Sequence, residues 1–191
     1  MRSRGRSIPT KTGDFLRLYK NFGIDIQSFE PTGKSSFQSW LPMFTNHQPI
    51  ISVHNTFTRG EDLDFAKSWQ QDFKQPIYFC LCINANHYIE QKTPPIDLLR
   101  ENNCQIVLGT DSYASNEQLN ILEEVKTIQQ QTNYSVPLPE LLKWATINGA
   151  KALQLDDKLG SFEKGKIPGI VLIENLDNLK TTHQSFARRI L

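Results

Sequence analysis

Short apolar runs alternate with longer amphipathic stretches along most of the chain. Three of these runs, at 50–53, 77–82 and 105–108, are rich in β-branched and other apolar residues and have the length of strands. Continuous apolar runs of this kind are typical of parallel strands that are covered on both faces. The pattern therefore predicts three parallel strands, each of which ends where a polar residue or a glycine follows.

The segments around these strands have helical periodicity. Apolar residues recur at spacings of three and four, and glycine, proline or a capping residue stands at the ends of the segments. The residues from Cys82 to Asn86 are predicted to form a loop. The predicted helices lie at 13–22, at 35–41, after a capping box of Thr58 and Glu61, at 95–101, after a second capping box of Ser115 and Gln118, and at 139–153.

The predicted strands end at regular intervals. His54, Cys82 and Asp111 stand at or just after three strand ends, and they are separated by 28 and 29 residues. One strand, one helix and their two loops together need about 30 residues in a βα array. The spacing therefore predicts an α/β fold of the TIM-type (β/α) barrel kind. Because a complete barrel needs about 250 residues, the chain is expected to form only a partial barrel, with the N-terminal part missing.

The pattern changes near residue 159. Three glycines and one proline between 160 and 169 separate short segments, and 170–173 is one clear strand. We expect this part to begin a small C-terminal β element. The predicted regions are a disordered basic start at 1–12, a partial barrel at 13–158 and the separate β element at 159–191.

Composition and charge favour a protein that acts on small molecules. Hydrophobic residues make up 38% of the chain, and 21 Lys and Arg residues are balanced by 20 Asp and Glu residues. Such a balance gives no large net field that would attract nucleic acid or anionic lipid. No apolar stretch reaches the about 18–20 residues that a membrane-spanning helix needs. We therefore expect a small-molecule substrate, no nucleic acid, no membrane and, as a possible partner, a second copy of the chain in a homodimer.

The three cysteines, Cys80, Cys82 and Cys104, lie in or beside apolar runs. An odd number of cysteines in such positions fits buried thiols in the reducing cytoplasm better than a disulfide framework, so the protein is expected to be cytoplasmic. Cys80 and Cys82 alternate along one predicted strand, which puts both thiols on the same face. The pair could bind a soft metal, but we interpret it as buried core sulfur.

Polar residues at the strand ends are the candidates for chemistry. In a βα array the carboxyl ends of the strands line one face, and the active site lies there. His54 and Asp111 both fall at this face. Each alone has a structural explanation, because a histidine can be a satisfied polar group and an aspartate often precedes a helix. Their recurrence at equivalent points of successive units favours a shared site.

Several motifs, in this order, resemble the amidohydrolase superfamily and its deaminase and chlorohydrolase branch. The resemblance covers residues 13–173. It implies that 13–158 form the C-terminal half of the family's barrel and that 159–191 form the segment that returns into a small β-sandwich. It also implies hydrolysis of a non-peptide C–N bond by metal-activated water. The motifs are Val53-His54-Asn55-Thr56, Cys82-Ile83-Asn84-Ala85-Asn86, Leu108-Gly109-Thr110-Asp111-Ser112, the helix from Trp144 to Leu153, and the segments 159–166 and 168–173.

The resemblance also implies roles for single residues. Asp111 matches the aspartate of the eighth strand, which contacts the metal and carries a proton from the metal-bound water to the leaving amine. His54 matches the histidine of the sixth strand, which is either a metal ligand or a contact to the water and the substrate. Asn86 and Ser112 are expected to bind substrate or support the site. Asn86 matches the last residue of the family's C-P-x-x-N motif, in which Ile83 here replaces the proline.

The chain departs from the family in its metal ligands. The family takes its histidine ligands from an H-x-H pair on the first strand and from the fifth strand. The four histidines here, His47, His54, His87 and His183, include no two separated by one residue. The glutamate that follows the fifth-strand histidine and acts as an acid is also absent from the part that aligns. A catalytic zinc has about three protein ligands, so Asp111 and His54 alone form an incomplete site.

The resemblance therefore implies a divalent metal, with zinc first and iron or nickel as alternatives, in a site that a missing N-terminal half of the barrel would complete. The isolated chain is expected to be inactive. The alternative function is that of a non-catalytic truncated product or pseudo-enzyme that acts only by association.

Overall fold

The computed structural model describes residues 15–44 and 48–191. The predicted start at 1–12 and the first two residues of the predicted helix at 13–22 lie outside these ranges. The chain divides into two compact units, one made of Met1–Gln48 and Phe57–Gln75, the other of Pro49–Thr56 and Pro76–Leu191. No helix within the described ranges has the length and apolar character needed to cross a membrane.

The first unit is helical in its described part, with α2 at Phe15–Asn21, α3 at Ser36–Trp40, the 3₁₀ helix η1 at Leu41–Met43 and α4 at Gly60–Phe73. The buried carboxylate of Asp62 accepts hydrogen bonds from the Ser35 hydroxyl, the Gln38 amide and the backbone N–H of Arg59. Helix α4 therefore starts after Arg59. The predicted capping box of Thr58 and Glu61 is wrong by one residue, because it is Asp62 that is buried against these donors.

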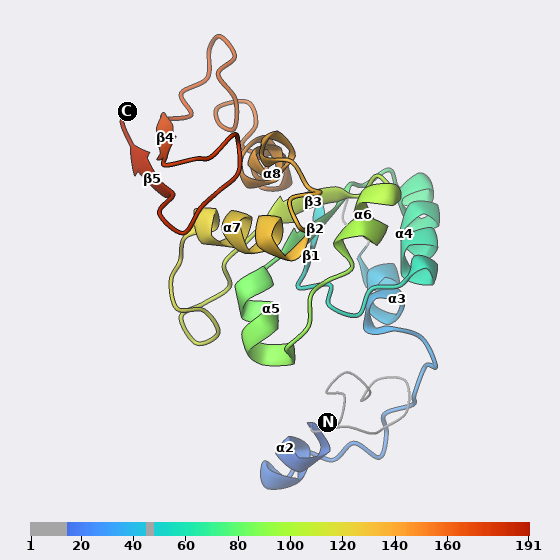
Figure 1. Ribbon diagram of the computed structural model, residues 1–191. Coiled ribbons are helices and arrows are strands. Elements are labelled where there is room, and N and C mark those ends of the chain that lie inside the picture. Colours follow the sequence, from blue (N-terminus) through green and yellow to red (C-terminus); the bar gives the residue numbers. More distant parts are fainter. Residues whose placement is uncertain (1–14, 45–47) are drawn as a thin grey trace. The chain divides into compact units, whose positions relative to one another are not determined.

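The second unit is built on a parallel sheet. Strands β1 at Ile50–Val53, β2 at Ile77–Leu81 and β3 at Gln105–Leu108 lie side by side in that order (Figure 1). All three predicted strands are confirmed to within one residue. The outer strand β1 differs from the prediction of two covered faces, since Ile51 and Val53 are 38% and 49% exposed. Only the central strand β2 has neighbours on both sides among the three, and it is buried along almost its whole length.

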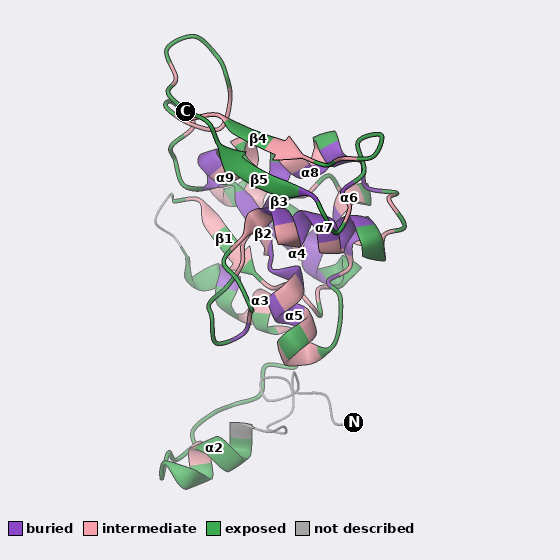
Figure 2. Cartoon of the chain, turned by 60° about the vertical axis from the view of Figure 1, so that its left-hand side comes forward, coloured by how far each residue is buried: buried purple, intermediate pink, exposed green. Residues whose placement is uncertain are grey.

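The helices of the second unit are α5 at Ile83–Glu90, α6 at Ile96–Glu101, α7 at Ile121–Gln131, α8 at Leu138–Ala145 and α9 at Ile147–Ala152. Helices α8 and α9 contact β3, and α7 contacts α5 and α8. The buried residues of this unit lie on β2, β3 and all five helices, with the largest number on α7, whereas the C-terminal hairpin is mostly exposed (Figure 2).

Two predictions for the helices are wrong. The residues after Cys82 form the start of α5 rather than a loop, since the N–H of Asn86 donates to the Cys82 carbonyl. The single helix predicted at 139–153 is broken at Thr146, which has φ −128° and ψ −91°. The carbonyl of Thr146 then accepts from the N–H of Ala150 and starts α9.

The predicted capping box of Ser115 and Gln118 is also wrong. Helix α7 begins at Ile121, and its cap is Asn120, whose side chain accepts the N–H of Leu122 at 3.0 Å. The Ser115 hydroxyl is buried and donates to the Asp111 carboxylate instead. The charged carboxylate of Asp111 therefore accepts from the hydroxyl that the local motif would use.

The C-terminal segment forms an antiparallel hairpin of β4 at Val171–Glu174 and β5 at Phe186–Arg189. The strand predicted at 170–173 is confirmed to within one residue, while β5 was not predicted. Gln129 of α7 anchors this segment, because its buried side-chain oxygen accepts both the N–H and the hydroxyl of Thr181, at 2.8 and 2.9 Å.

Gly160 lies where the chain passes α9 on its way to this hairpin. Its φ is +85°, and a Cβ there would lie 2.7 Å from the Ala150 Cβ and 2.8 Å from the Ile147 Cα. We expect Gly160→Ala to lower the free energy of unfolding by about 2–4 kcal/mol, from left-handed strain and overpacking together. Urea denaturation measures the change. Gly165→Ala is the matched control, since Gly165 has φ +95° but open space around it. Equal losses for the two variants would show that the contact with α9 contributes nothing.

Candidate functional site

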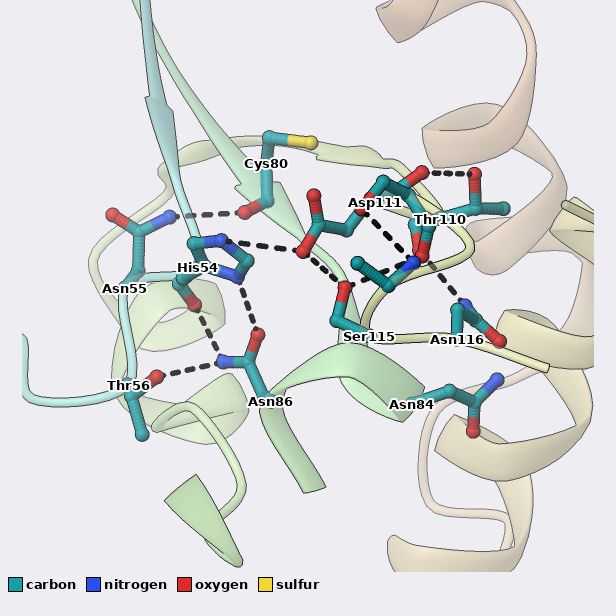
Figure 3. Close-up of polar contacts among 12 residues, drawn as sticks. His54, Asn55, Thr56, Cys80, Asn84, Asn86, Thr110, Asp111, Ser115 and Asn116 are labelled. Carbon is teal, nitrogen blue, oxygen red and sulfur yellow. Dashed lines mark hydrogen bonds and ion pairs between the residues drawn. The ribbon is translucent and has the colours of Figure 1, made fainter. Parts of the chain in front are cut away.

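The ends of β1 and β3 bring His54 and Asp111 together (Figure 3). The Nε2 atom of His54 lies 3.9 Å from Oδ2 of Asp111, and the two side chains are 39% and 30% exposed. Both are therefore accessible from solvent. The sequence predicted this convergence at the carboxyl ends of parallel strands, and the structure places the two residues there.

Both strand ends have a left-handed backbone. The φ angles are 71° at His54, 57° at Asn55 and 58° at Asp111. Such angles are uncommon outside glycine, although Asn, Asp and His adopt them more readily than other residues. The buried Asn55 stabilises its turn, since its amide donates to the carbonyls of Ser52 and Cys80 at 2.8 and 3.1 Å. Backbone strain of this kind clusters at functional sites, which supports a shared role for these two turns.

Asn86 of α5 fixes the ring of His54. Its amide nitrogen donates to the His54 carbonyl at 3.0 Å and to the Thr56 hydroxyl at 2.8 Å, so its oxygen faces the ring. That oxygen lies 2.9 Å from Nδ1 of His54. Because an amide oxygen can only accept, Nδ1 carries the proton. In the neutral ring, Nε2 is then unprotonated, and its lone pair faces Asp111.

Two electron-rich atoms thus face each other across 3.9 Å, which is too long for a direct hydrogen bond. This arrangement suits an electron-poor species, such as a metal ion, that bonds to both Nε2 of His54 and Oδ2 of Asp111. Zinc takes nitrogen and oxygen ligands at about 2.0–2.2 Å, so a divalent cation fits between Nε2 and Oδ2. Within 15–44 and 48–191, no group of three His, Cys, Asp or Glu side chains is placed to hold a metal ion. His54 and Asp111 could therefore supply two ligands of a larger set.

The Asp111 carboxylate is held from the other side by Ser115. The Ser115 hydroxyl, which is 6% exposed, donates to Oδ2 of Asp111 at 2.5 Å. The structural explanation that Asp111 caps a helix is wrong, because α7 begins ten residues later at Ile121 with its own cap. The carboxylate is thus oriented toward His54 by a hydrogen bond within its own loop.

Ser112 lies apart from this arrangement. It is exposed, and its hydroxyl accepts the N–H of Ala114 at 3.3 Å, while its carbonyl accepts the N–H of Ser115. These contacts shape the turn after Asp111. The predicted contact of Ser112 with substrate stays a prediction.

A buried carboxylate, which the sequence analysis missed, holds the loop that follows β3 and carries Asp111. Glu124 of α7 is 0% exposed and accepts from the backbone N–H and the side chain of Asn84, at 3.1 and 2.9 Å, and from Asn116 at 2.8 Å. The same amide group of Asn116 donates to the carbonyl of Thr110, the residue before Asp111. The available signal was an acidic residue beside Val125 in the apolar stripe of this helix.

Comparison with known proteins defines the family. The sequence profile of the amidohydrolase family matches residues 49–188. A 5-methylthioadenosine/S-adenosylhomocysteine deaminase of Thermoanaerobacter pseudethanolicus is 34% identical over 154 residues, which cover 78% of this chain and 34% of the relative. A 5'-deoxyadenosine deaminase of Methanococcus maripaludis is 38% identical over 167 residues, which cover 83% and 38%. The chain therefore belongs to the amidohydrolase family.

Solved structures agree with this assignment. Aminofutalosine deaminase of Helicobacter pylori, in complex with methylthio-coformycin, matches with a TM-score of 0.66 and 25% identity, over 92% of this chain and 41% of that one. A zinc-bound adenosine deaminase of Xanthomonas campestris shares the fold, with a TM-score of 0.59 and 20% identity over 90% and 34%. The chain thus spans 34% to 41% of the length of these four proteins.

Proposed function

We propose that this chain supplies part of the active site of a metal-dependent deaminase that hydrolyses the exocyclic C–N bond of a 6-aminopurine nucleoside. The observation that carries the proposal is the convergence of His54 Nε2 and Asp111 Oδ2, 3.9 Å apart at the carboxyl ends of parallel strands. The names of the two curated relatives support the substrate class, since both name adenosine derivatives.

In this proposal, the three parallel strands belong to a (β/α) barrel formed by 13–158, and 159–191 is the return into a β-sandwich. The remaining metal ligands come from an N-terminal half of the barrel. The parallel sheet, the regular spacing of its strand ends and the partial coverage of the relatives support this arrangement.

The residues of the chain have distinct tasks. His54 Nε2 and the Asp111 carboxylate would hold a divalent cation, which when bound makes a water molecule more acidic. Asp111 accepts a proton at its carboxylate and passes it to the leaving amine. Asn86 keeps the lone pair of His54 directed at the same point, and Ser115 keeps the carboxylate oriented.

A chimera tests the proposal. Residues 49–188 would replace the matching segment of the Thermoanaerobacter deaminase, whose remaining part would supply the other ligands. We expect the chimera to bind zinc and to release ammonia from 5-methylthioadenosine, whereas the chain alone should bind zinc weakly and release none, because two ligands are too few. Circular dichroism and elemental analysis monitor folding and zinc content. A folded, zinc-loaded chimera that releases no ammonia would overturn the proposal.

A further inference from the structure

Cys80 and Cys82 form a pair of thiols that the proposed function does not use. Cys80 is the fourth residue of β2, the strand between those that carry His54 and Asp111, and Figure 3 shows its sulfur there. Cys82 directly follows β2 and is 2% exposed, whereas Cys80 is partly buried. The two thiols are hydrogen-bonded to each other. Cys80 packs against the core cluster of Tyr78, Val107 and Ala152, so the interpretation as core sulfur holds for both cysteines but does not explain why the two thiols are paired.

Both sulfurs converge over Gly109. A Cβ at Gly109 would lie 2.8 Å from the sulfur of Cys80 and 3.2 Å from that of Cys82. The backbone of Gly109 does not itself require glycine, since its φ lies outside the left-handed region and its N–H extends the sheet by donating to the Leu81 carbonyl. The two sulfurs therefore lie so close to the point where a side chain at residue 109 would begin that only glycine lets both thiols approach it.

A soft cation fits this pair of thiols better than zinc does. Cys80 and Cys82 are both free thiols in the structure, so both sulfurs are available as ligands. Structural zinc takes four ligands, and across the described part of the chain the two thiols gain no third His, Cys, Asp or Glu ligand. Thiolates select Cu(I), which is stable with only two of them.

The charges around the pair also favour a cation. The hydrogen bond from Cys82 lowers the pKa of the Cys80 thiol, so Cys80 is the first to form a thiolate. That same hydrogen bond raises the pKa of Cys82, and burial and the negative charges of Cys80, Glu124 and Asp111 raise it further. These negative charges make it harder for Cys82 to lose its proton when no cation is present. The same charges attract a cation that lies between the two sulfurs and so favour its binding.

We propose that Cys80 and Cys82 form a two-thiolate site over Gly109 for one soft d¹⁰ cation of the Cu(I) class. Binding forms two bonds between the cation and sulfur and releases two protons to solvent, with no change of oxidation state. The site adjoins the His54–Asp111 pair but uses neither residue. A test of Cu(I) binding therefore does not depend on whether the proposed deaminase function is correct.

Titration of the full chain with Cu(I) tests this proposal. The chain would be reduced, kept without oxygen and titrated in competition with a chromogenic Cu(I) chelator, and X-ray absorption would identify the ligand atoms. We expect one Cu(I) per chain with sulfur ligands. Cys80→Ser and Cys82→Ser should each weaken Cu(I) binding by about 100-fold or more. Loss of a residue that only supports a metal ligand already costs about 10–100-fold, and each cysteine here is itself a ligand. Cys104→Ser is the matched control and should leave the affinity unchanged.

Gly109→Ala gives the sharpest variant, because it keeps both thiols but puts a methyl group 2.8 Å and 3.2 Å from the positions of their sulfurs, which forces the thiols apart. It should lose Cu(I) affinity to a similar extent, although a thiol reagent still detects three cysteines in the unfolded chain. If this variant does not fold, the two serine variants decide. Unchanged affinity in Cys80→Ser or Cys82→Ser, or an absorption spectrum with only nitrogen and oxygen ligands, would overturn the proposal.

Discussion

Asp111→Asn is expected to lower the rate of ammonia release by the chimera by about a thousandfold, within the range that general acid–base catalysis contributes. The asparagine side chain keeps the shape of aspartate, and its oxygen can still accept the hydrogen bond from Ser115. It cannot take a proton from water and deliver it to the leaving amine. The measurement is the initial rate with 5-methylthioadenosine, together with the zinc content of both proteins.

Asp97→Asn is the matched control for this experiment. It makes the same chemical change at a side chain that is 73% exposed on α6, where Asp97 forms an i,i+3 ion pair with Arg100. Its rate should equal that of the unaltered chimera. If Asp111→Asn and Asp97→Asn give similar rates at equal zinc content, Asp111 has no part in the proton transfer.

The sequence predicted the sheet and the central pair of the site because both follow from regular patterns. Apolar runs of four to six residues identified the strands, and the carboxyl ends of parallel strands share one edge of the sheet. His54 and Asp111 could therefore be placed together without any knowledge of their contacts. Asn86 was placed in the same site through the family motif, although the segment that carries it is a helix.

Helix α5 could not be predicted from local sequence. Asparagine is a poor helix former, and Asn84 and Asn86 both lie in its first turn. The backbone N–H of Asn84 is satisfied by the carboxylate of Glu124, 40 residues further along the chain. Because a distant side chain satisfies the first turn of α5, the local sequence contains no capping residue from which the start of the helix could be predicted.

The two capping boxes failed for a related reason. At Thr58 and at Ser115 the spacing of the motif is correct, but carboxylates outside the motif determine the hydrogen bonds. Asp62 gathers donors from Arg59 and α3, and Asp111 takes the hydroxyl of Ser115. Charge-assisted hydrogen bonds are about twice as strong as neutral ones, so such a partner outweighs the local motif.

The buried carboxylate of Glu124 is expected to contribute strongly to the stability of the fold. Glu124→Ala would leave the donors of Asn84 and Asn116 without their acceptor inside the protein. Since each unsatisfied buried donor costs about 1–3 kcal/mol, we expect the free energy of unfolding to fall by about 3–5 kcal/mol. Urea denaturation of the full chain, followed by circular dichroism, measures this loss.

The neighbouring residue supplies the matched control. Glu123 lies on the same turn of α7 and forms an ion pair with Lys126 at 2.7 Å, but its side chain is 28% exposed. The loss of unfolding free energy in Glu123→Ala should be about 1–2 kcal/mol, because Lys126, whose side chain is 10% exposed, loses its partner but has a flexible stem that can carry the ammonium to water. The loss of unfolding free energy in Glu124→Gln should lie between those of Glu124→Ala and Glu123→Ala, because the amide oxygen can accept from one donor while the NH₂ group faces another.

In the chimera, Glu124→Ala should also slow ammonia release, because Asn116 would no longer be held against the Thr110 carbonyl beside Asp111. Equal stability of Glu124→Ala and Glu123→Ala would show that other contacts hold this loop.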